Sequence, residues 1–312
     1  MPESRGTGAA ALLFLHAQTA LHPGSGTALG TVDLPVQRER HTEWPVIPGS
    51  ALKGVLRDAC REAIAVGLPS EGAGSRRQRA DETARIAGGF GPARVEGDEA
   101  HIGALSVTDA RLLAFPVRSL KGVFAWITCP LSLQRLKRDL ALAGGNADFT
   151  VPEPEPDRAI CPKTALCVPP DRLVLEEFDY TIAGDAPDVT AWFAGHVSND
   201  PGTLKRLESH LVVLHDGDFT HYVKHATEVV ARVGLDYERK TVKDGALFYQ
   251  EFLPAETIFY SVVLAGPSRR KDDRTTAQEW LGYLRQTVPS VIQVGGDATV
   301  GKGLCSIRWS EE

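Results

Sequence analysis

Residues 13–57 read LFLHAQTALHPGSGTALGTVDLPVQRERHTEWPVIPGSALKGVLR, and this stretch passes through three kinds of local structure. An apolar run predicts a strand over residues 9–18, and a turn rich in glycine follows it. From Ser50, a favourable helix N-cap, the pattern becomes helical. One stripe of this predicted helix is apolar and should face a core: Leu52, Val55, Leu56, Ala59 and Ile64. The opposite face carries a basic row at four-residue steps: Lys53, Arg57 and Arg61.

Composition limits what this stretch can belong to. A chain of 312 residues with 43% hydrophobic content can bury a large core, as one elaborated domain or as two. No apolar run approaches the roughly 20 residues that span a bilayer. The start MPESRGTG lacks a signal sequence, so we expect a cytoplasmic protein without a membrane segment. Five scattered cysteines without a C-x-x-C pair argue against a disulfide framework and a zinc site.

The net charge of −6 excludes binding of nucleic acid through bulk positive charge. A nucleic-acid function would therefore need a local groove. Candidate basic clusters are Arg38 and Arg40, the row on the predicted helix, Arg76 to Arg79, and Arg135 to Arg138. Each cluster taken alone is also compatible with an ordinary solvated face.

The order of predicted elements indicates an α+β fold. Strands are predicted at 102–108, 121–129, 173–182, 211–214, 229–235, 246–252, 258–264, 291–294 and 304–309. Helices are predicted at 131–142 and 276–287, with a short one in DETARIAGGF. Both halves follow the strand, helix, strand, strand, helix, strand order of a ferredoxin-like fold. Residues 68–99 should form a mobile insertion and residues 144–171 an extended one.

The first glycine-rich loop contains the candidate catalytic residues. Gly24, Gly26 and Gly30 let backbone amides approach a phosphate, although a plain turn explains them as well. Asp33 could hold a divalent cation, or could be a turn-forming aspartate that bonds its own backbone. His22 could be a general acid or base, or a structural histidine at a strand end.

Two later segments also carry polar side chains of chemical interest. The run QVGGDATVGKG places Gly296, Gly301, Lys302 and Gly303 between two strands, where amides and an ammonium group could meet a phosphate. The alternative is a flexible hairpin connection. His221 and His225 are four residues apart, which suits two metal ligands on a helix face, but no H-E-x-x-H motif surrounds them.

Three segments together resemble a known family: HPGSGTALGTVDLPVQRERHTEWPVIPGSALKGVLR, TEVVARVGLDYERKTVKDGALFYQEFLPAETIF and GGDATVGKG. They are similar to the RAMP superfamily, and within it to the repeated backbone subunit of type III-B (Cmr) CRISPR effector complexes. The resemblance implies a single domain over residues 1–312, with a ferredoxin-like (RRM-like) palm and a protruding thumb hairpin over residues 218–252. It also implies binding of guide RNA and target RNA, further copies of the chain in a filament, and other Cmr subunits including the small helical one.

The resemblance assigns roles to particular residues. It implies that Asp33 is needed for cleavage of target RNA with magnesium or manganese, and that His22 lies at a motif histidine. Guide contacts would come from Ser50, Lys53, Arg57, Arg38, Gly296, Gly301, Lys302 and Gly303. Glu238 or Glu251 could supply a second carboxylate.

Two other functions remain open at this stage. The chain could be a structural guide-binding backbone whose complex cuts elsewhere. It could also be a stand-alone guide-processing ribonuclease that uses His22 or His16 without a metal. The structural-backbone hypothesis predicts that replacing Asp33 leaves cleavage of target RNA unchanged. The ribonuclease hypothesis predicts that precursor repeat RNA is cleaved even in the presence of a chelator.

Overall fold

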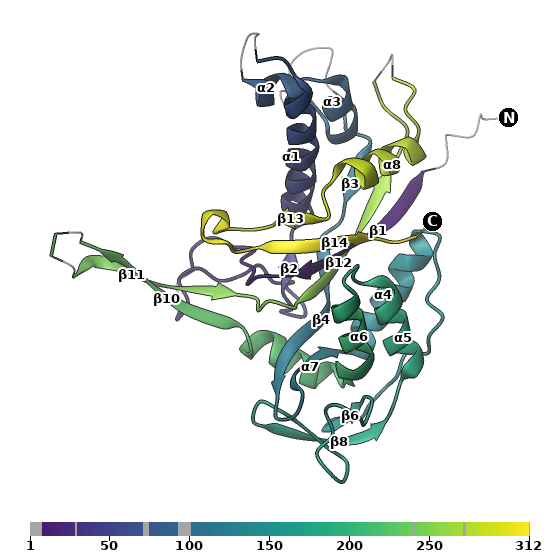
Figure 1. Cartoon of the computed structure of the whole chain (residues 1–312), viewed down its shortest axis with the longest axis vertical. Helices are drawn as coiled ribbons and strands as arrows, with labels where there is room; N and C mark the ends of the chain where they lie inside the picture. The colour runs from purple at the N-terminus through teal and green to yellow at the C-terminus, as the bar shows by residue number, and fades with distance from the viewer. Residues whose placement is uncertain are drawn as a thin grey trace.

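The computed structural model describes residues 8–28, 30–70, 75–92, 101–236, 238–239, 241–270 and 273–311. One large mixed sheet runs through the molecule, and a two-stranded hairpin projects from its side (Figure 1). The strands of the large sheet are β1 (Ala9–Ala17), β2 (Val46–Ile47), β3 (Leu105–Val107), β4 (Ala110–Ser119), β5 (Val123–Thr128), β6 (Arg158–Ile160), β7 (Arg172–Leu175), β8 (Phe178–Gly184), β9 (Leu211–Leu214), β12 (Ile258–Ala265), β13 (Val291–Gln293) and β14 (Leu304–Trp309).

Helices cover the sheet in two groups (Figure 1). The first group is α1 (Gly49–Gly67), α2 (Arg76–Asp81), α3 (Ala84–Phe90) and α8 (Ala277–Thr287). The second is α4 (Pro130–Leu142), α5 (Pro187–His196), α6 (Pro201–His210) and α7 (Asp216–His225). A 3-10 turn, η2 (Ala298–Val300), precedes β14. No helix in the described part of the chain is long and apolar enough to cross a membrane.

Strand β1 lies at the centre of the fold. It pairs antiparallel with β12 on one side and with β14 on the other, and β12 pairs in turn with β3 and β4. Leu13 and Leu15 pack into the core that includes Leu52 of α1, whereas Phe14 packs into a second core under α4 and α5. Because both faces of β1 are buried, its sequence is a nearly continuous apolar run.

The start of α1 corrects one prediction. Ser50 is not the N-cap: Pro48 occupies that position, and Ser50 is exposed in the first turn. The amide of Gly49 donates instead to Oδ1 of Asp109, at 2.7 Å. The orphan amide of the helix end is thus satisfied from the start of β4, which spacing within the 13–57 stretch could not reveal.

The structure differs from the predicted elements in two further ways. The single strand predicted at 173–182 is two strands, β7 and β8, because Glu176 adopts a left-handed turn with φ of 48° between them. Strand β4 and helices α5 and α6 were not predicted. Pro187 and Pro201 start these helices, where a missing backbone N–H costs nothing.

The two predicted insertions contain regular structure in their described parts. Within 68–99, α2 and α3 are capped by Ser75 and Thr83, and α3 packs Gly88 and Gly89 against Trp280 of α8. Residues 71–74 and 93–99 lie outside the described residues. Within 144–171, β6 joins the sheet, and the rest is irregular.

The projecting hairpin consists of β10 (Glu228–Leu235) and β11 (Val242–Phe252), and α7 leads directly into it (Figure 1). Its pairing is antiparallel, with Arg232 opposite Phe248 and Val230 opposite Gln250. Large apolar side chains along it are exposed: Val229, Val230, Val233, Leu235, Val242, Leu247 and Tyr249. The hairpin therefore extends away from the core instead of packing on it.

Candidate functional site

The first glycine loop, the last glycine loop and the base of the hairpin meet at one place, which we call the hairpin junction (residues 22–28, 30–38, 294–303 and 249–252, with Arg232). Leu34 forms a β-bridge with Gln250 of β11. The amide of Gly296 donates to the carbonyl of His22 at 2.9 Å, so the two glycine loops touch directly. Segments from the two ends of the chain are thus side by side.

Asp33 is held by the hairpin. Its Oδ2 accepts a hydrogen bond from the amide of Tyr249 at 2.7 Å, and its own amide donates to the carbonyl of Tyr249 at 3.1 Å. The residue is half-buried, and its Oδ1 accepts no hydrogen bond from the described residues. The carboxylate is therefore fixed in direction by one oxygen while the other can bind a ligand.

His22 is buried within the junction. Its Nδ1 donates to the carbonyl of Glu251 at 2.6 Å, which requires the proton on that nitrogen, and its ring lies 5.5 Å from that of Phe252. The Nε2 atom faces Gly24, where an added β-carbon would lie only 2.7 Å away. The side chain thus joins the hairpin to the first loop as a packing element.

Arg38 and Glu251 form an ion pair that ties the first loop to β11. Arg38 Nη2 donates to Oε1 of Glu251 at 2.6 Å, and its Nη1 donates to the carbonyl of Val223 at 2.9 Å. The other carboxylate oxygen accepts the amide of Val36 at 2.9 Å, and Thr227 donates to Oε1. Both predicted functional side chains are therefore engaged inside the protein.

The last loop owes its shape to glycine. Gly301 and Gly303 have φ of 74° and 75°, and a β-carbon on Gly303 would lie 2.0 Å from the carbonyl oxygen of Val294. Lys302 is half-buried, with Nζ 5.1 Å from the centre of the Phe252 ring. Its ammonium group therefore sits between the loop and the hairpin base.

Sequence reasoning missed three residues of the junction: Arg232, Gln250 and Asp297. Asp297 Oδ1 accepts from Arg232 at 3.0 Å, and its Oδ2 accepts from Gln250 at 2.7 Å. Asp297 is the acidic residue within GGDATVGKG, and that was the available signal, but its partners lie on a different element.

The predicted basic residues of α1 lie away from the junction and already have partners. Lys53 donates to the carbonyl of Leu105 at 2.9 Å, and burial, followed by the charge of Arg57, lowers its pKa. Arg57 donates to Asp81 of α2 at 2.9 Å and to the carbonyl of Gly91 at 3.1 Å. Ser50, in contrast, is exposed.

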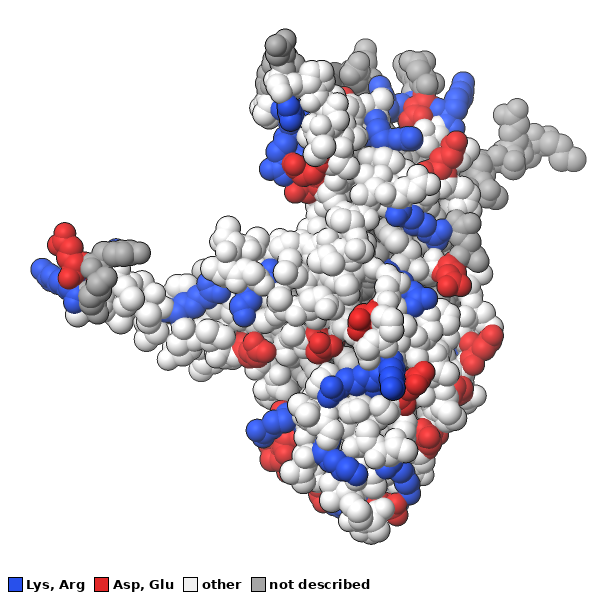
Figure 2. Space-filling view, in the orientation of Figure 1, with Lys and Arg blue, Asp and Glu red and all other residues white. Residues whose placement is uncertain are grey.

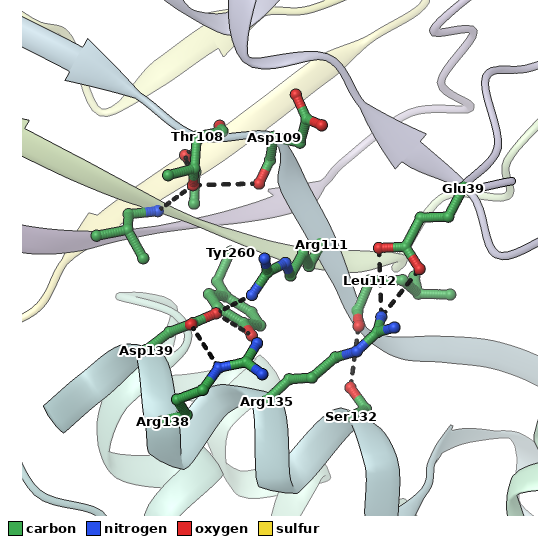
Figure 3. Close-up of polar contacts among 12 residues, drawn as sticks. Glu39, Thr108, Asp109, Arg111, Leu112, Ser132, Arg135, Arg138, Asp139 and Tyr260 are labelled. Carbon is green, nitrogen blue, oxygen red and sulfur yellow. Dashed lines mark hydrogen bonds and ion pairs between the residues drawn. The ribbon is translucent and has the colours of Figure 1, made fainter. Parts of the chain in front are cut away.

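The basic cluster on α4 is likewise part of an internal network (Figure 3). Arg135 donates to Oε2 of Glu39 at 2.9 Å, which anchors the R-E-R-H segment to the helix. Asp139 accepts from Tyr260 at 2.9 Å and also pairs with Arg111. Figure 2 shows blue and red side chains interspersed over this face of the molecule, without one large basic surface.

The candidate metal ligands do not form a cluster. Among the described residues, no group of three His, Cys, Asp or Glu side chains could hold an ion. His221 and His225 lie with ring centres 4.8 Å apart on α7. His16 contacts Glu256 through Nε2 at 2.8 Å and Gln18 through Nδ1 at 3.0 Å, so both ring nitrogens are engaged. In the described part of the chain, Asp33 is thus not a member of a three-ligand cluster.

Comparison with known proteins identifies the family. The model of the RAMP superfamily matches residues 14–306. The chain belongs to this superfamily. A relative from Pyrococcus furiosus, described as the CRISPR system Cmr endoribonuclease Cmr4, is 37% identical over 303 residues, which cover 96% of this chain and 95% of the relative. The resemblance read from the sequence motifs is confirmed.

Solved structures agree with this assignment. The crystal structure of oligomeric Cmr4 from Pyrococcus furiosus matches with a TM-score of 0.69 and 31% identity, covering 97% of this chain and 98% of the other. A type III-B Cmr-beta structure bound to cognate target RNA matches with a TM-score of 0.69 at 20% identity, covering 96% of each chain, and so supports the fold alone. The predicted α+β class is confirmed.

Proposed function

We propose that this chain is an endoribonuclease subunit of a type III-B CRISPR complex, and that it binds guide RNA and cleaves complementary target RNA. The 37% identity to a named Cmr endoribonuclease over nearly the whole of both chains supports the activity. The observation that carries the site assignment is the Asp33 carboxylate. One of its oxygens is fixed by the Tyr249 amide, and the other is open to a ligand at the hairpin junction.

The strand order supports a ferredoxin-like palm. The order β14, β1, β12, β3, with α1 following β1 and α8 following β12, is that of a split βαβ fold. The hairpin β10–β11, reached through α7, corresponds on this proposal to the thumb over residues 218–252. Its exposed apolar side chains suit contact with RNA bases or a neighbouring copy in a filament.

A magnesium or manganese ion fits Asp33 in one mode. Such ions are commonly held by one or two carboxylates together with substrate phosphates and water. Asp33 would supply the protein ligand, and oxygens of the RNA would supply others. When bound, the ion stabilises negative charge on the scissile phosphate. His22 then serves by holding the first loop against β11, because its Nδ1 is committed to the carbonyl of Glu251.

Guide RNA would lie along the loops and the start of α1. Lys302 can contact a phosphate without displacing an internal carboxylate, and Ser50 is exposed. The amides of Gly296, Gly301 and Gly303 already donate to the carbonyls of His22, Ala298 and Ala20, so a phosphate would have to replace these acceptors. Lys53, Arg57 and Arg38 would first have to exchange their internal partners. Other copies of the chain and other Cmr subunits, including the small helical one, would complete the groove.

The test is cleavage of labelled complementary RNA by the complex reconstituted with Asp33→Ala, with and without magnesium. We expect guide binding and assembly at the unmodified level and loss of cleavage of about 10²-fold or more. Glu208→Ala, an exposed carboxylate on α6, is the matched control and should cleave normally. Full cleavage by Asp33→Ala would favour the second candidate, a non-catalytic guide-binding backbone. Cleavage in chelator would favour the metal-free ribonuclease.

A further inference from the structure

Asp297 joins the last loop to both strands of the hairpin. Its Oδ1 accepts a hydrogen bond from Nη1 of Arg232 on β10 at 3.0 Å. Its Oδ2 accepts from Nε2 of Gln250 on β11 at 2.7 Å. The side chain of Asp297 is 19% exposed and Gln250 is 4% exposed, so the contacts are largely shielded from water. Charge-assisted hydrogen bonds of this kind hold geometry well.

The backbone of Asp297 also organises the loop that carries Lys302. Asp297 is left-handed, with φ of 63°, and its carbonyl accepts the amides of Val300 and Lys302 at 3.1 and 3.2 Å. Non-glycine residues in this conformation are uncommon and often mark functional positions. Asp297 thus stabilises the loop through its backbone and contacts the hairpin through its side chain.

Two positive charges lie near Phe252, and the carboxylate of Asp297 offsets them. The guanidinium of Arg232 and the ammonium of Lys302 lie 5.5 and 5.1 Å from the centre of the same ring. In the described part of the chain, Asp297 is the carboxylate that pairs with Arg232, and it lies on the loop that carries Lys302. Without it, Arg232 and Lys302 would repel each other across the ring, and the hairpin would tilt away from the last loop.

The contacts of Asp297 and of Asp33 with the hairpin are made by neighbouring residues of β11. Gln250 binds Asp297, while the amide of the preceding Tyr249 binds Asp33. Neighbouring residues of a strand move together, so a tilt of β11 that frees Gln250 also displaces the amide that orients Asp33. A displacement of about 1 Å at a reacting group can cost about 10²-fold in rate.

We infer that Asp297 is a positioning residue for target cleavage: it latches the hairpin to the last loop and thereby fixes Tyr249 and, through it, Asp33. This inference rests on the proposed role of Asp33. It makes the angle of the hairpin, and not only its presence, a determinant of the cleavage rate. Arg232 and Gln250 act in the same latch as the partners of Asp297.

The hairpin angle can be measured directly. Cysteines introduced at exposed Thr241 near the hairpin tip and exposed Gln286 on α8 would take spin labels, because the five native cysteines are buried. The distance distribution is recorded in the guide-loaded complex without target, so it does not depend on cleavage. We expect a single narrow distance for the parent chain, and a broader or longer one for Asp297→Asn.

Kinetics of the same complexes separate positioning from binding. Asp297→Asn keeps the size and the left-handed preference of Asp297 but removes its charge. We expect about 10- to 100-fold slower cleavage at saturating target, with unchanged target affinity. Arg232→Gln should give a similar loss, and the double variant should be no worse than the poorer single one, because one pair is broken in each case.

Distinct outcomes overturn the inference. An unchanged distance distribution with slow cleavage would mean that Asp297 does not act through the hairpin. Additive losses in the double variant, or weakened target binding, would place Asp297 or Arg232 on the RNA. Full cleavage by Asp297→Asn would remove its role altogether. Failure of the proposed function is separate, since active Asp33→Ala would refute that proposal while leaving the distance measurement in place.

Discussion

Glu251 should be the largest single polar contributor to the attachment of the hairpin. Its carboxylate is 8% exposed and accepts from Arg38 at 2.6 Å, from the amide of Val36 at 2.9 Å and from Thr227 at 2.9 Å. We therefore consider Glu251→Ala and the isosteric Glu251→Gln. Either change removes the charge that holds the first loop and the start of β10 against β11.

The expected loss follows from these contacts. Removing one partner of a buried ion pair costs about 3–5 kcal/mol, and a buried amide left without an acceptor costs about 1–3 kcal/mol. Arg38 remains 22% exposed and can regain water, and both effects belong to one carboxylate, so they do not simply add. We expect about 3 kcal/mol for Glu251→Ala. Glu251→Gln should lose about 1–2 kcal/mol, because its amide keeps one oxygen acceptor where the carboxylate accepts from three donors.

Urea unfolding of the purified chain measures both losses, and hydrogen exchange at the Val36 amide locates them. The control is Glu228→Ala, an exposed carboxylate at the start of β10, which should change stability by less than about 0.5 kcal/mol. Equal unfolding midpoints for Glu251→Ala and Glu228→Ala would refute the reasoning. So would unchanged exchange at Val36 in Glu251→Ala.

Two further predictions concern the loops. Gly301→Ala should lose about 1–2 kcal/mol from its left-handed φ of 74°, and Gly303→Ala should lose several-fold more in urea unfolding, because its β-carbon would meet Val294. Equal losses would contradict that close approach. Burial alone would raise the pKa of Glu39. Hydrogen bonds from Thr42 and Arg135 and the charge of Arg135 lower the pKa by more than burial raises it, so the net pKa lies below the ordinary 4.5. Its contribution to stability should be complete above pH 4.5 and fade as pH falls through the lowered pKa; Glu39→Gln should flatten this acid limb, and an unchanged limb would argue against the pairing with Arg135.

The sequence predicted those helices and strands that are determined by residues within the element itself. Helix α8 has a capping box of Thr276 and Glu279, and its apolar side chains recur at helical spacing. Helix α5 was missed because PDVTAWFAGH is short and apolar without a clear stripe. The cap of α1 was assigned to Ser50 because the true acceptor, Asp109, lies 60 residues away in the sequence.

In the candidate site, too, residues within local motifs were predictable and contacts between distant segments were not. Asp33 and the last glycine loop were found from motifs, because unusual residues occur together within a few positions. Asp297 and its partners lie 65 and 47 residues apart, so the latch exists only once the hairpin folds back on the last loop. The internal engagement of Arg38 and Arg57 was also invisible, since Glu251 and Asp81 lie on other elements.

These internal pairs bear on how a chain of net charge −6 could hold RNA. Arg38, Arg57 and Arg232 are each paired with a carboxylate of the protein. Their charges stabilise the fold and add little attraction for phosphate. On the proposed function, recognition would then depend first on the ammonium group of Lys302, whose position the glycines and Asp297 set, because the amides of Gly296, Gly301 and Gly303 already donate to carbonyls of the protein. A contact to phosphate carries no information about the base, which is what a subunit that accepts any guide sequence requires.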